Sequence, residues 1–394
     1  MRPSTISALA RPQVLQLPAY NAGPSNAAVR ERYRIERISR LASNENPFGP
    51  SPAVARALSG LAGEVGNYPD ANCTALRHAM AERLGVAAGR LVFGDGSEDL
   101  VKLLCEVFLG PDDLALTQRP VFGLHEIYPR MMGAGVQLLE LNAELGFDVA
   151  AWCAALRREP KLAFLPNPSN PVGCMMDAAA FARVLEATSE RTVLVVDEAY
   201  HEYARHAPGY PDVLAQLAAR RGPWIVLRTF SKAWGLAGLR VGYAIASELE
   251  LAALLDKVRS PFNVNLAAQR AALAALSDAG HMEHAVARTV QLREALAAQL
   301  AALAAPGQPL QGLRLAPSAA NFLFMDIGRA SAPVAQALLE RGVIIKPWKD
   351  PGFEHFLRVS VGAAADNQRF VEALLEVLAP PGERFAAAPV ATQC

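Results

Sequence analysis

The sequence is poor in cysteine, and its cysteines are dispersed. Five cysteines are spread over 394 residues, and none forms a Cys-x-x-Cys pair or lies at metal-ligand spacing from a histidine. An odd, scattered set argues against a disulfide framework and against zinc, and it favours a reducing compartment. We therefore expect a cytoplasmic protein that holds no metal.

The sequence also lacks an excess of one charge and a long hydrophobic run. Its 38 basic and 38 acidic side chains cancel, so we expect neither nucleic acid nor an anionic membrane surface as a partner. No apolar stretch reaches the length of a membrane span, and no signal-peptide core is evident near the first residue. A chain of this size can bury a large core and form more than one domain.

One segment, residues 228–242, concentrates the chemistry. An apolar run at 224–227 is typical of a buried strand, and it is followed by Thr229, Ser231, Lys232, three glycines and Arg240. Hydroxyl and guanidinium groups bind phosphate, and glycines let the backbone approach a ligand closely. A lysine among apolar neighbours has a destabilised ammonium, so its neutral amine can attack a carbonyl. This combination predicts a phosphate site with a Schiff-base lysine, the pattern expected for pyridoxal phosphate.

A second phosphate-binding element is predicted at residues 91–108. An apolar strand at 91–93 leads into a glycine-rich loop at 94–98, and apolar residues at helical spacing follow. The first backbone N–H groups of such a helix hold phosphate. Gly96, Ser97 and Glu98 are the candidate cofactor contacts.

Strand ends supply the remaining groups that the cofactor needs. The β-branched run at 192–196 is typical of a parallel strand buried on both faces, and it ends in Asp197. A carboxylate there points into the crevice where α/β sheets bind ligands, so it can pair with the ring nitrogen. Asn170, in a turn with three prolines whose bonds are candidates for the cis form, and Tyr200 can donate to the phenolic oxygen of the cofactor. Phe122 can stack on its ring.

The motifs Asn-Pro-Ser-Asn-Pro at 167–171, Asp-Glu-Ala-Tyr at 197–200 and Ser-Lys-Ala-Trp-Gly-Leu-Ala-Gly-Leu-Arg at 231–240 resemble those of fold-type I aminotransferases. Together with Leu-Pro-Ala-Tyr at 17–20, Ala-Ser-Asn-Glu-Asn-Pro at 42–47 and Leu-Arg-Val-Ser-Val-Gly at 357–362, the set resembles the histidinol-phosphate aminotransferase family. The resemblance covers nearly the whole chain. It implies a transamination of amino-acid and 2-oxo-acid substrates, namely histidinol phosphate and 2-oxoglutarate, in two alternating half-reactions through a Lys232 Schiff base.

The resemblance also implies a homodimer with shared active sites and several substrate contacts. By position in the motifs, Tyr68 would reach the cofactor phosphate of the neighbouring subunit, and Arg358 would bind the carboxylate or phosphate of the substrate. Tyr20 and Asn44 would lie near the substrate. Lys346 stands where many family members carry arginine, so it supplies charge without the guanidinium fork.

Two departures from the family pattern leave the substrate open. Phe122 stands where the family often has tyrosine, and Lys346 stands where many members have arginine. Trp348, which follows the Lys346-Pro347 pair, is a feature that would favour an aromatic side chain. The alternatives are an aromatic or broad-range aminotransferase, a decarboxylase of a phosphorylated amino acid, and a non-catalytic regulator built on the same fold. The regulator would need an added DNA-binding module, for which the first 40 residues are too few.

The expected fold is α/β, with a large cofactor domain and a smaller α+β domain. We predict an N-terminal arm and small-domain segment over 1–45, the large domain with a mostly parallel, helix-flanked sheet over 46–275, and the small domain over 276–380. Residues 381–394 are predicted to be a disordered tail.

Overall fold

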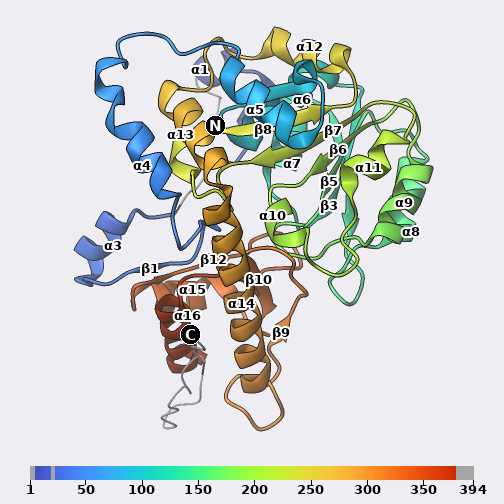
Figure 1. Ribbon diagram of the computed structural model, residues 1–394. Helices are drawn as coiled ribbons and strands as arrows, with labels where there is room; N and C mark the ends of the chain where they lie inside the picture. The colour runs from blue at the N-terminus through green and yellow to red at the C-terminus, as the bar shows by residue number, and fades with distance from the viewer. Residues whose placement is uncertain (1–4, 19–22, 379–394) are drawn as a thin grey trace.

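A seven-stranded sheet forms the centre of the computed structural model, which describes residues 5–18 and 23–378 (Figure 1). The strand order is β2-β8-β7-β6-β5-β3-β4. All strands run parallel except β8, which is antiparallel to both of its neighbours. The mostly parallel sheet predicted from the sequence is therefore confirmed. In chain order its strands are β2 (Leu91–Gly94), β3 (Leu114–Arg119), β4 (Gly135–Glu140), β5 (Leu162–Pro166), β6 (Val193–Asp197), β7 (Trp224–Thr229) and β8 (Gly242–Ala246).

Helices cover both faces of this sheet because its central strands are apolar on both sides. In β6, Val193 and Val195 pack into one apolar cluster, and Leu194 and Val196 pack into another, since successive side chains of a strand point to opposite faces. The first cluster is closed by α6 (Gly96–Phe108), α7 (Leu124–Met132) and α12 (Leu249–Val258). The second is closed by α5 (Thr74–Leu84), α8 (Val149–Leu156), α9 (Ala178–Ala187) and α13 (Leu266–Ser277).

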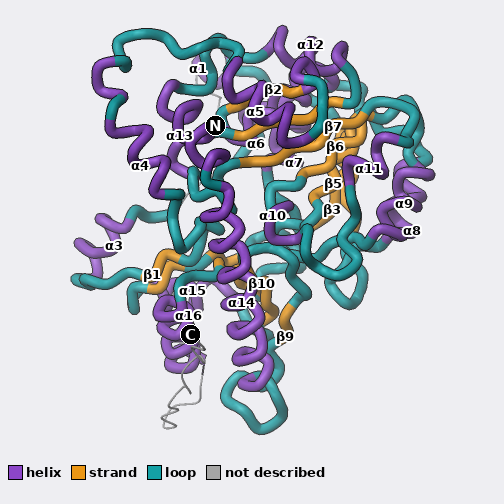
Figure 2. Tube along the Cα trace, viewed as in Figure 1, coloured by secondary structure: helices purple, strands orange, loops and turns teal. Residues whose placement is uncertain are grey.

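A second, four-stranded antiparallel sheet has the order β12-β13-β10-β9. Figure 2 shows it apart from the seven-stranded sheet, with the long helix α14 leading toward it. This region has its own apolar core. Its strands are β9 (Arg314–Leu315), β10 (Phe322–Asp326), β12 (Lys346–Pro347) and β13 (Phe356–Ser360), and its helices are α14 (Ala279–Leu303), α15 (Ser331–Leu339) and α16 (Ala364–Leu378).

An early segment of the chain joins this second region. β1 (Ser39–Arg40) pairs in parallel with β11 (Val343–Ile344), and the loop that follows β1 continues toward both sheets. The remaining elements are α1 (Thr5–Leu9), α2 (Pro12–Leu15), α3 (Asn26–Tyr33), α4 (Pro52–Ser59), α10 (His201–Ala204), α11 (Val213–Ala218) and the 3₁₀ turns η1 (Leu61–Gly63), η2 (Ala88–Arg90) and η3 (Ala237–Leu239).

One local expectation differs from the structure. The loop expected over 94–98 is shorter, because α6 already begins at Gly96, and the Asp99 carboxylate accepts from the Asp95 N–H at 3.1 Å to close its first turn. The segment over 343–347 is divided between two sheets, because β11 pairs with β1 and β12 pairs with β13. The Asn167–Pro168 and Asn170–Pro171 bonds are cis, as the proline-rich turn indicated.

Some sequence predictions concern parts of the chain that the structure leaves undescribed. Tyr20 and the tail at 381–394 lie outside the described residues. The domain boundaries proposed at 46 and 276 stay predictions. Among the described helices, none is long and apolar enough to cross a membrane.

Candidate active site

The candidate site lies where the parallel strands end. β5, β6 and β7 are neighbours in the sheet, so their carboxyl ends at Pro166, Asp197 and Thr229 lie on one edge. Ligands of α/β sheets bind beside this edge. The loops that follow carry Asn170, Tyr200 and Lys232, and sequence position alone would separate these three residues widely.

Lys232 lies just beyond β7 and is partly buried. Its Nζ donates to the carbonyl oxygen of Ser43 at 2.9 Å. Burial first, and then the positive charge of Arg358, lowers the pKa of Lys232 to about 8; Glu45 opposes this shift, and Arg240 adds a lesser lowering effect. The site therefore raises the fraction of the neutral amine, which is the nucleophilic form.

Asp197 is held by a histidine that the sequence analysis did not identify. The Oδ2 atom of Asp197 lies 3.1 Å from Nε2 of His125, whose ring is fully buried. The imidazole stacks on Phe164, with centroids 5.1 Å apart, and meets Phe122 edge-on at 5.8 Å. The arrangement fixes the carboxylate and the predicted stacking residue in one cluster. No motif marks His125, although it comes three residues after Phe122.

Tyr200 and Asn170 are both tied to residues from distant parts of the chain. The Tyr200 hydroxyl accepts from Asn44 Nδ2 at 2.9 Å, and Asn170 Oδ1 accepts from Arg358 Nη1 at 2.6 Å. Burial raises the pKa of Tyr200, against the effects of Arg358 and the Asn44 hydrogen bond. The phenol therefore keeps its proton at neutral pH.

Arg240 connects the β7 loop to the start of α6. Its guanidinium donates to Ser231 Oγ at 3.4 Å and to the carbonyl oxygen of Asp95 at 3.2 Å, and it lies 3.8 Å from a carboxylate oxygen of Glu98. Thr229 Oγ1 accepts from the Ser231 N–H at 3.0 Å, which shapes the loop. Hydroxyl, guanidinium and helix N–H groups thus meet at one place.

Two glycines allow Arg240 and the first turn of α6 to approach closely, and we call this place the Arg240 cradle. A Cβ at Gly96, whose φ is +75°, would collide with the Arg240 guanidinium, and a Cβ at Gly242 would collide with the backbone nitrogen of Ser97. The close approach brings the first turn of α6 beside Arg240 and β8, and the first N–H groups of such a helix can bind phosphate. These residues fit a phosphate group.

Arg358 and Lys346 lie side by side on the second sheet. They are paired partners of β13 and β12. Arg358 also donates to the carbonyl oxygen of Ala42 at 2.6 Å, and its guanidinium lies 6.0 Å from the Trp348 ring centroid. Burial and then the charge of Arg358 lower the pKa of Lys346. The pair forms a cationic wall that favours an anionic group.

Tyr68 lies apart from these residues in the single chain. Its side chain is 82% exposed, and its ring stacks on that of Phe262 with centroids 4.5 Å apart. This position leaves the tyrosine open to contacts outside its own chain.

A buried ion pair, Glu198 with Arg228, joins the carboxyl ends of β6 and β7. Glu198 is fully buried, and its Oε2 lies 2.8 Å from Nη2 of Arg228. Tyr210 donates to Glu198 Oε1 at 2.7 Å, and His201 Nδ1 lies 3.2 Å from the same oxygen. Burial opposes ionisation of Glu198, but Arg228 and these neighbours outweigh it and lower the pKa to about 2. These contacts fix the position of Glu198, the residue next to Asp197.

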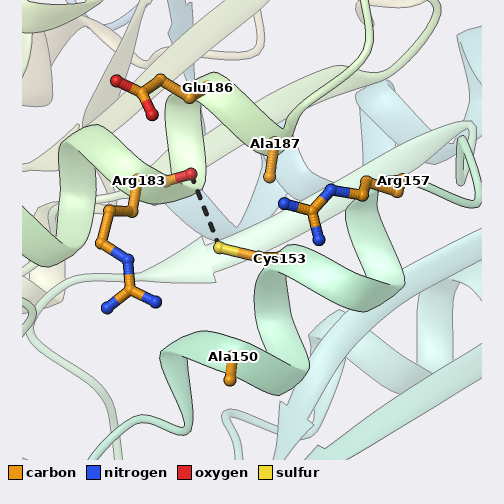
Figure 3. A pocket seen from close by; sticks show the side chains of 6 residues that line it. All are labelled: Ala150, Cys153, Arg157, Arg183, Glu186 and Ala187. Carbon is orange, nitrogen blue, oxygen red and sulfur yellow. Dashed lines mark hydrogen bonds between the residues drawn. The ribbon is translucent and has the colours of Figure 1, made fainter.

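A separate hollow of about 410 Å³ lies between α8 and α9 (Figure 3). Its lining includes Cys153, whose Sγ donates to the carbonyl oxygen of Arg183 at 3.5 Å, and the exposed side chains of Arg157 and Glu186. None of the predicted site residues lines it. Over residues 5–18 and 23–378, no group of three histidine, cysteine, aspartate or glutamate side chains could hold a metal ion.

Comparisons with known proteins identify the family of the chain. The model of the family "Aminotransferase class I and II" matches residues 36–374. Histidinol-phosphate aminotransferase 1 of Mesorhizobium japonicum is 43% identical over 95% of this chain and 100% of its own length. Histidinol-phosphate aminotransferase 3 of Rhizobium meliloti is 41% identical over 93% of this chain and 97% of its own.

A solved structure gives the same result. The histidinol-phosphate aminotransferase of Sinorhizobium meliloti, in complex with pyridoxal-5'-phosphate, superposes with a TM-score of 0.82 at 27% identity, over 93% of this chain and 96% of that one. The family model, the full-length relatives and the shared fold agree. The chain belongs to the class I and II aminotransferases and, within them, to the histidinol-phosphate aminotransferase family.

Proposed function

We propose that this protein is a pyridoxal phosphate-dependent aminotransferase that exchanges an amino group between histidinol phosphate and 2-oxoglutarate. The observation that carries the proposal is the position of Lys232, whose pKa of about 8 and place beside Arg358 suit a covalent amine nucleophile. The carboxylate of Asp197 and the Arg240 cradle complete the set of groups that this cofactor requires.

Each polar end of the cofactor has a matching group. Bound to Lys232, pyridoxal phosphate would act as an electron sink for a carbanion next to nitrogen. Asp197, oriented by His125, would keep the ring nitrogen protonated, and Phe122 would cover one face of the ring. Asn170 and Tyr200 would donate to its phenolic oxygen.

The phosphate end has its own set of donors. Arg240 and the hydroxyls of Ser231 and Thr229 would hold the phosphate from one side. Gly96, Ser97 and Glu98 would hold it through the first N–H groups of α6, while the two acidic side chains near Arg240 keep the guanidinium in place.

Lys232 would also move the proton. An amine with a pKa near the working pH can accept a proton on Nζ from the α-carbon of the substrate. It would then give this proton to the cofactor carbon on the other side of the shared nitrogen. The carbonyl oxygen of Ser43, which accepts from Nζ, orients the amine between these steps.

The cationic wall supports an anionic substrate. Arg358 would pair with the carboxylate of glutamate, and Lys346 would add charge for the phosphate of histidinol phosphate. The names of the relatives agree with this substrate. Tyr20 and Asn44 stand as further predicted substrate contacts.

We also propose a homodimer with shared active sites. Tyr68 is exposed and would reach the cofactor phosphate of the second subunit. A cytoplasmic location is retained from the sequence, and among the described residues the four cysteines are unpaired.

The first test is spectroscopy of single half-reactions. The protein loaded with pyridoxal phosphate is mixed in parallel with histidinol phosphate, glutamate and phenylalanine, and conversion to the pyridoxamine form is followed. Conversion by histidinol phosphate should be much faster than by phenylalanine. The reverse order would favour an aromatic aminotransferase, for which Trp348 beside Arg358 is the supporting feature, and release of carbon dioxide without a 2-oxo acid would indicate a decarboxylase.

The lysine assignment has its own control. Lys232→Ala should lose both turnover and the visible absorbance of the bound cofactor. Turnover retained in this variant would refute the assignment.

A further inference from the structure

Asn44 is a buried amide whose polar atoms are all engaged within the protein. It is 1% exposed, and it adopts a φ of +54°, a backbone conformation that asparagine and aspartate tolerate better than other side chains. Its backbone carbonyl accepts from Asn321 Nδ2 at 3.0 Å. The residue is therefore fixed in place by the chain segment that leads into β10.

Ser360 lies against the oxygen end of the Asn44 amide. The Ser360 oxygen accepts from the backbone N–H of Asn44 at 2.8 Å, and its hydroxyl donates to Asn44 Oδ1 at 2.9 Å. The amide oxygen can accept that hydrogen and the amide nitrogen cannot, so this hydrogen bond holds the oxygen of the side chain toward Ser360. The Nδ2 group is consequently turned toward Tyr200.

This orientation determines what Tyr200 can do with its own hydrogen. Asn44 Nδ2 lies 2.9 Å from the Tyr200 hydroxyl oxygen and can only donate to it. A phenol has one hydrogen, and this contact does not consume it. The ring of Tyr200 is held edge-on against Phe322, with centroids 5.1 Å apart, so the hydroxyl keeps its position.

We propose that Asn44 is a positioning residue, set by Ser360, that reserves the hydroxyl hydrogen of Tyr200 for the phenolic oxygen of the cofactor. The inference rests on the proposed function. It replaces the substrate contact that the sequence predicted for Asn44. Because Ser360 lies two residues after Arg358 on β13, the same strand that would bind the substrate anion also sets this donor.

Asn44→Asp is the direct test, because aspartate has the same shape and tolerates the same backbone. A carboxylate accepts from Ser360 and also from Tyr200, so the phenol hydrogen is drawn away from the cofactor. The readout is the pH midpoint of the visible absorbance change of the cofactor-loaded protein, measured in the Tyr200 and Tyr200→Phe backgrounds. The new charge acts in both backgrounds and cancels in the difference.

Donation of a hydrogen bond by the Tyr200 hydroxyl lowers the pH midpoint of the absorbance change, so loss of this hydrogen bond should raise the midpoint. We expect Asn44→Asp to raise the midpoint about one to two pH units more with Tyr200 present than with Tyr200→Phe, the size of one hydrogen bond to a charged group. The charged groups that act on Lys232 and Tyr200 are unchanged in all variants, namely Arg358, Arg240, Glu45 and Asp197. Equal shifts in the two backgrounds would overturn the inference.

A neutral variant keeps the test independent of the folding of Asn44→Asp. Ser360→Ala removes the donor that orients the amide, and it should raise the midpoint only when Tyr200 is present, whereas Ser360→Thr keeps the hydroxyl and should leave the midpoint unchanged. A Ser360→Ala shift that is the same without Tyr200 contradicts the proposal. If the wild-type protein showed no visible band with pyridoxal phosphate, the proposed function itself would fail; a normal band with equal shifts rejects only the role of Asn44.

Discussion

The amine of Lys232 in the cofactor-free protein should titrate with a pKa of about 8 instead of the ordinary 10.5. Burial disfavours the ammonium first, and the guanidinium groups of Arg358 and Arg240 disfavour it further. The shift is downward, so the neutral amine predominates above about pH 8 and the ammonium below it.

The consequence at neutral pH is large. Each pKa unit changes the neutral fraction tenfold well below the pKa, so a drop of about 2.5 units makes the reactive amine roughly 300-fold more abundant at pH 7 than an exposed lysine would provide. Without this shift, covalent loading of the cofactor would be slow at physiological pH.

The assay is the rate at which the cofactor-free protein bonds to pyridoxal, the aldehyde without phosphate, as a function of pH. The wild-type profile should rise with a midpoint of about 8. Arg358→Met removes a positive neighbour and should move the midpoint upward, while Arg358→Lys keeps the charge and should stay near the wild type. A wild-type midpoint near 10.5, or an Arg358→Met profile that does not move, would refute the electrostatic account.

Three further predictions follow from individual contacts. Gly242→Ala places a methyl group against the first turn of α6 and should weaken binding of pyridoxal phosphate in an equilibrium titration. The control is Gly238→Ala, whose methyl group meets nothing within 4 Å and should leave the affinity unchanged. Equal affinities of the two variants would rule out a phosphate site between Arg240 and the start of α6. Arg358→Ala should raise the glutamate concentration needed to saturate its half-reaction by about a hundredfold, the value of a strong charge-assisted contact, with a much smaller effect on cofactor affinity; unchanged glutamate saturation argues against the carboxylate contact. Glu198→Gln leaves the buried Arg228 without its counter-charge and should lower the free energy of unfolding in urea by about 3–5 kcal/mol; a loss below about 1 kcal/mol would show that the pair contributes little.

The sequence by itself determined the sheet and the chemistry of its strand ends. The run at 192–196 predicts a strand buried on both faces because four consecutive apolar residues follow Thr192, and the structure places β6 in the middle of the sheet. Lys232, Ser231 and Arg240 lie within one short segment, so their association needs little long-range information. The family resemblance, confirmed by full-length matches, follows from the same local motifs.

The tertiary structure decided how those groups are held. His125 is 72 positions from Asp197, and Ser360 is 316 positions from Asn44. Neither pair carries a periodic or spacing signal, because their contact depends on which strands are neighbours and on how β13 meets the loop after β1. Hydrogen bonds between such distant residues exist only when the whole chain has packed, since buried donors and acceptors must find their partners in the final arrangement. Local patterns therefore predicted the candidate reacting residues, whereas the residues that contact and orient them became visible only in the folded chain.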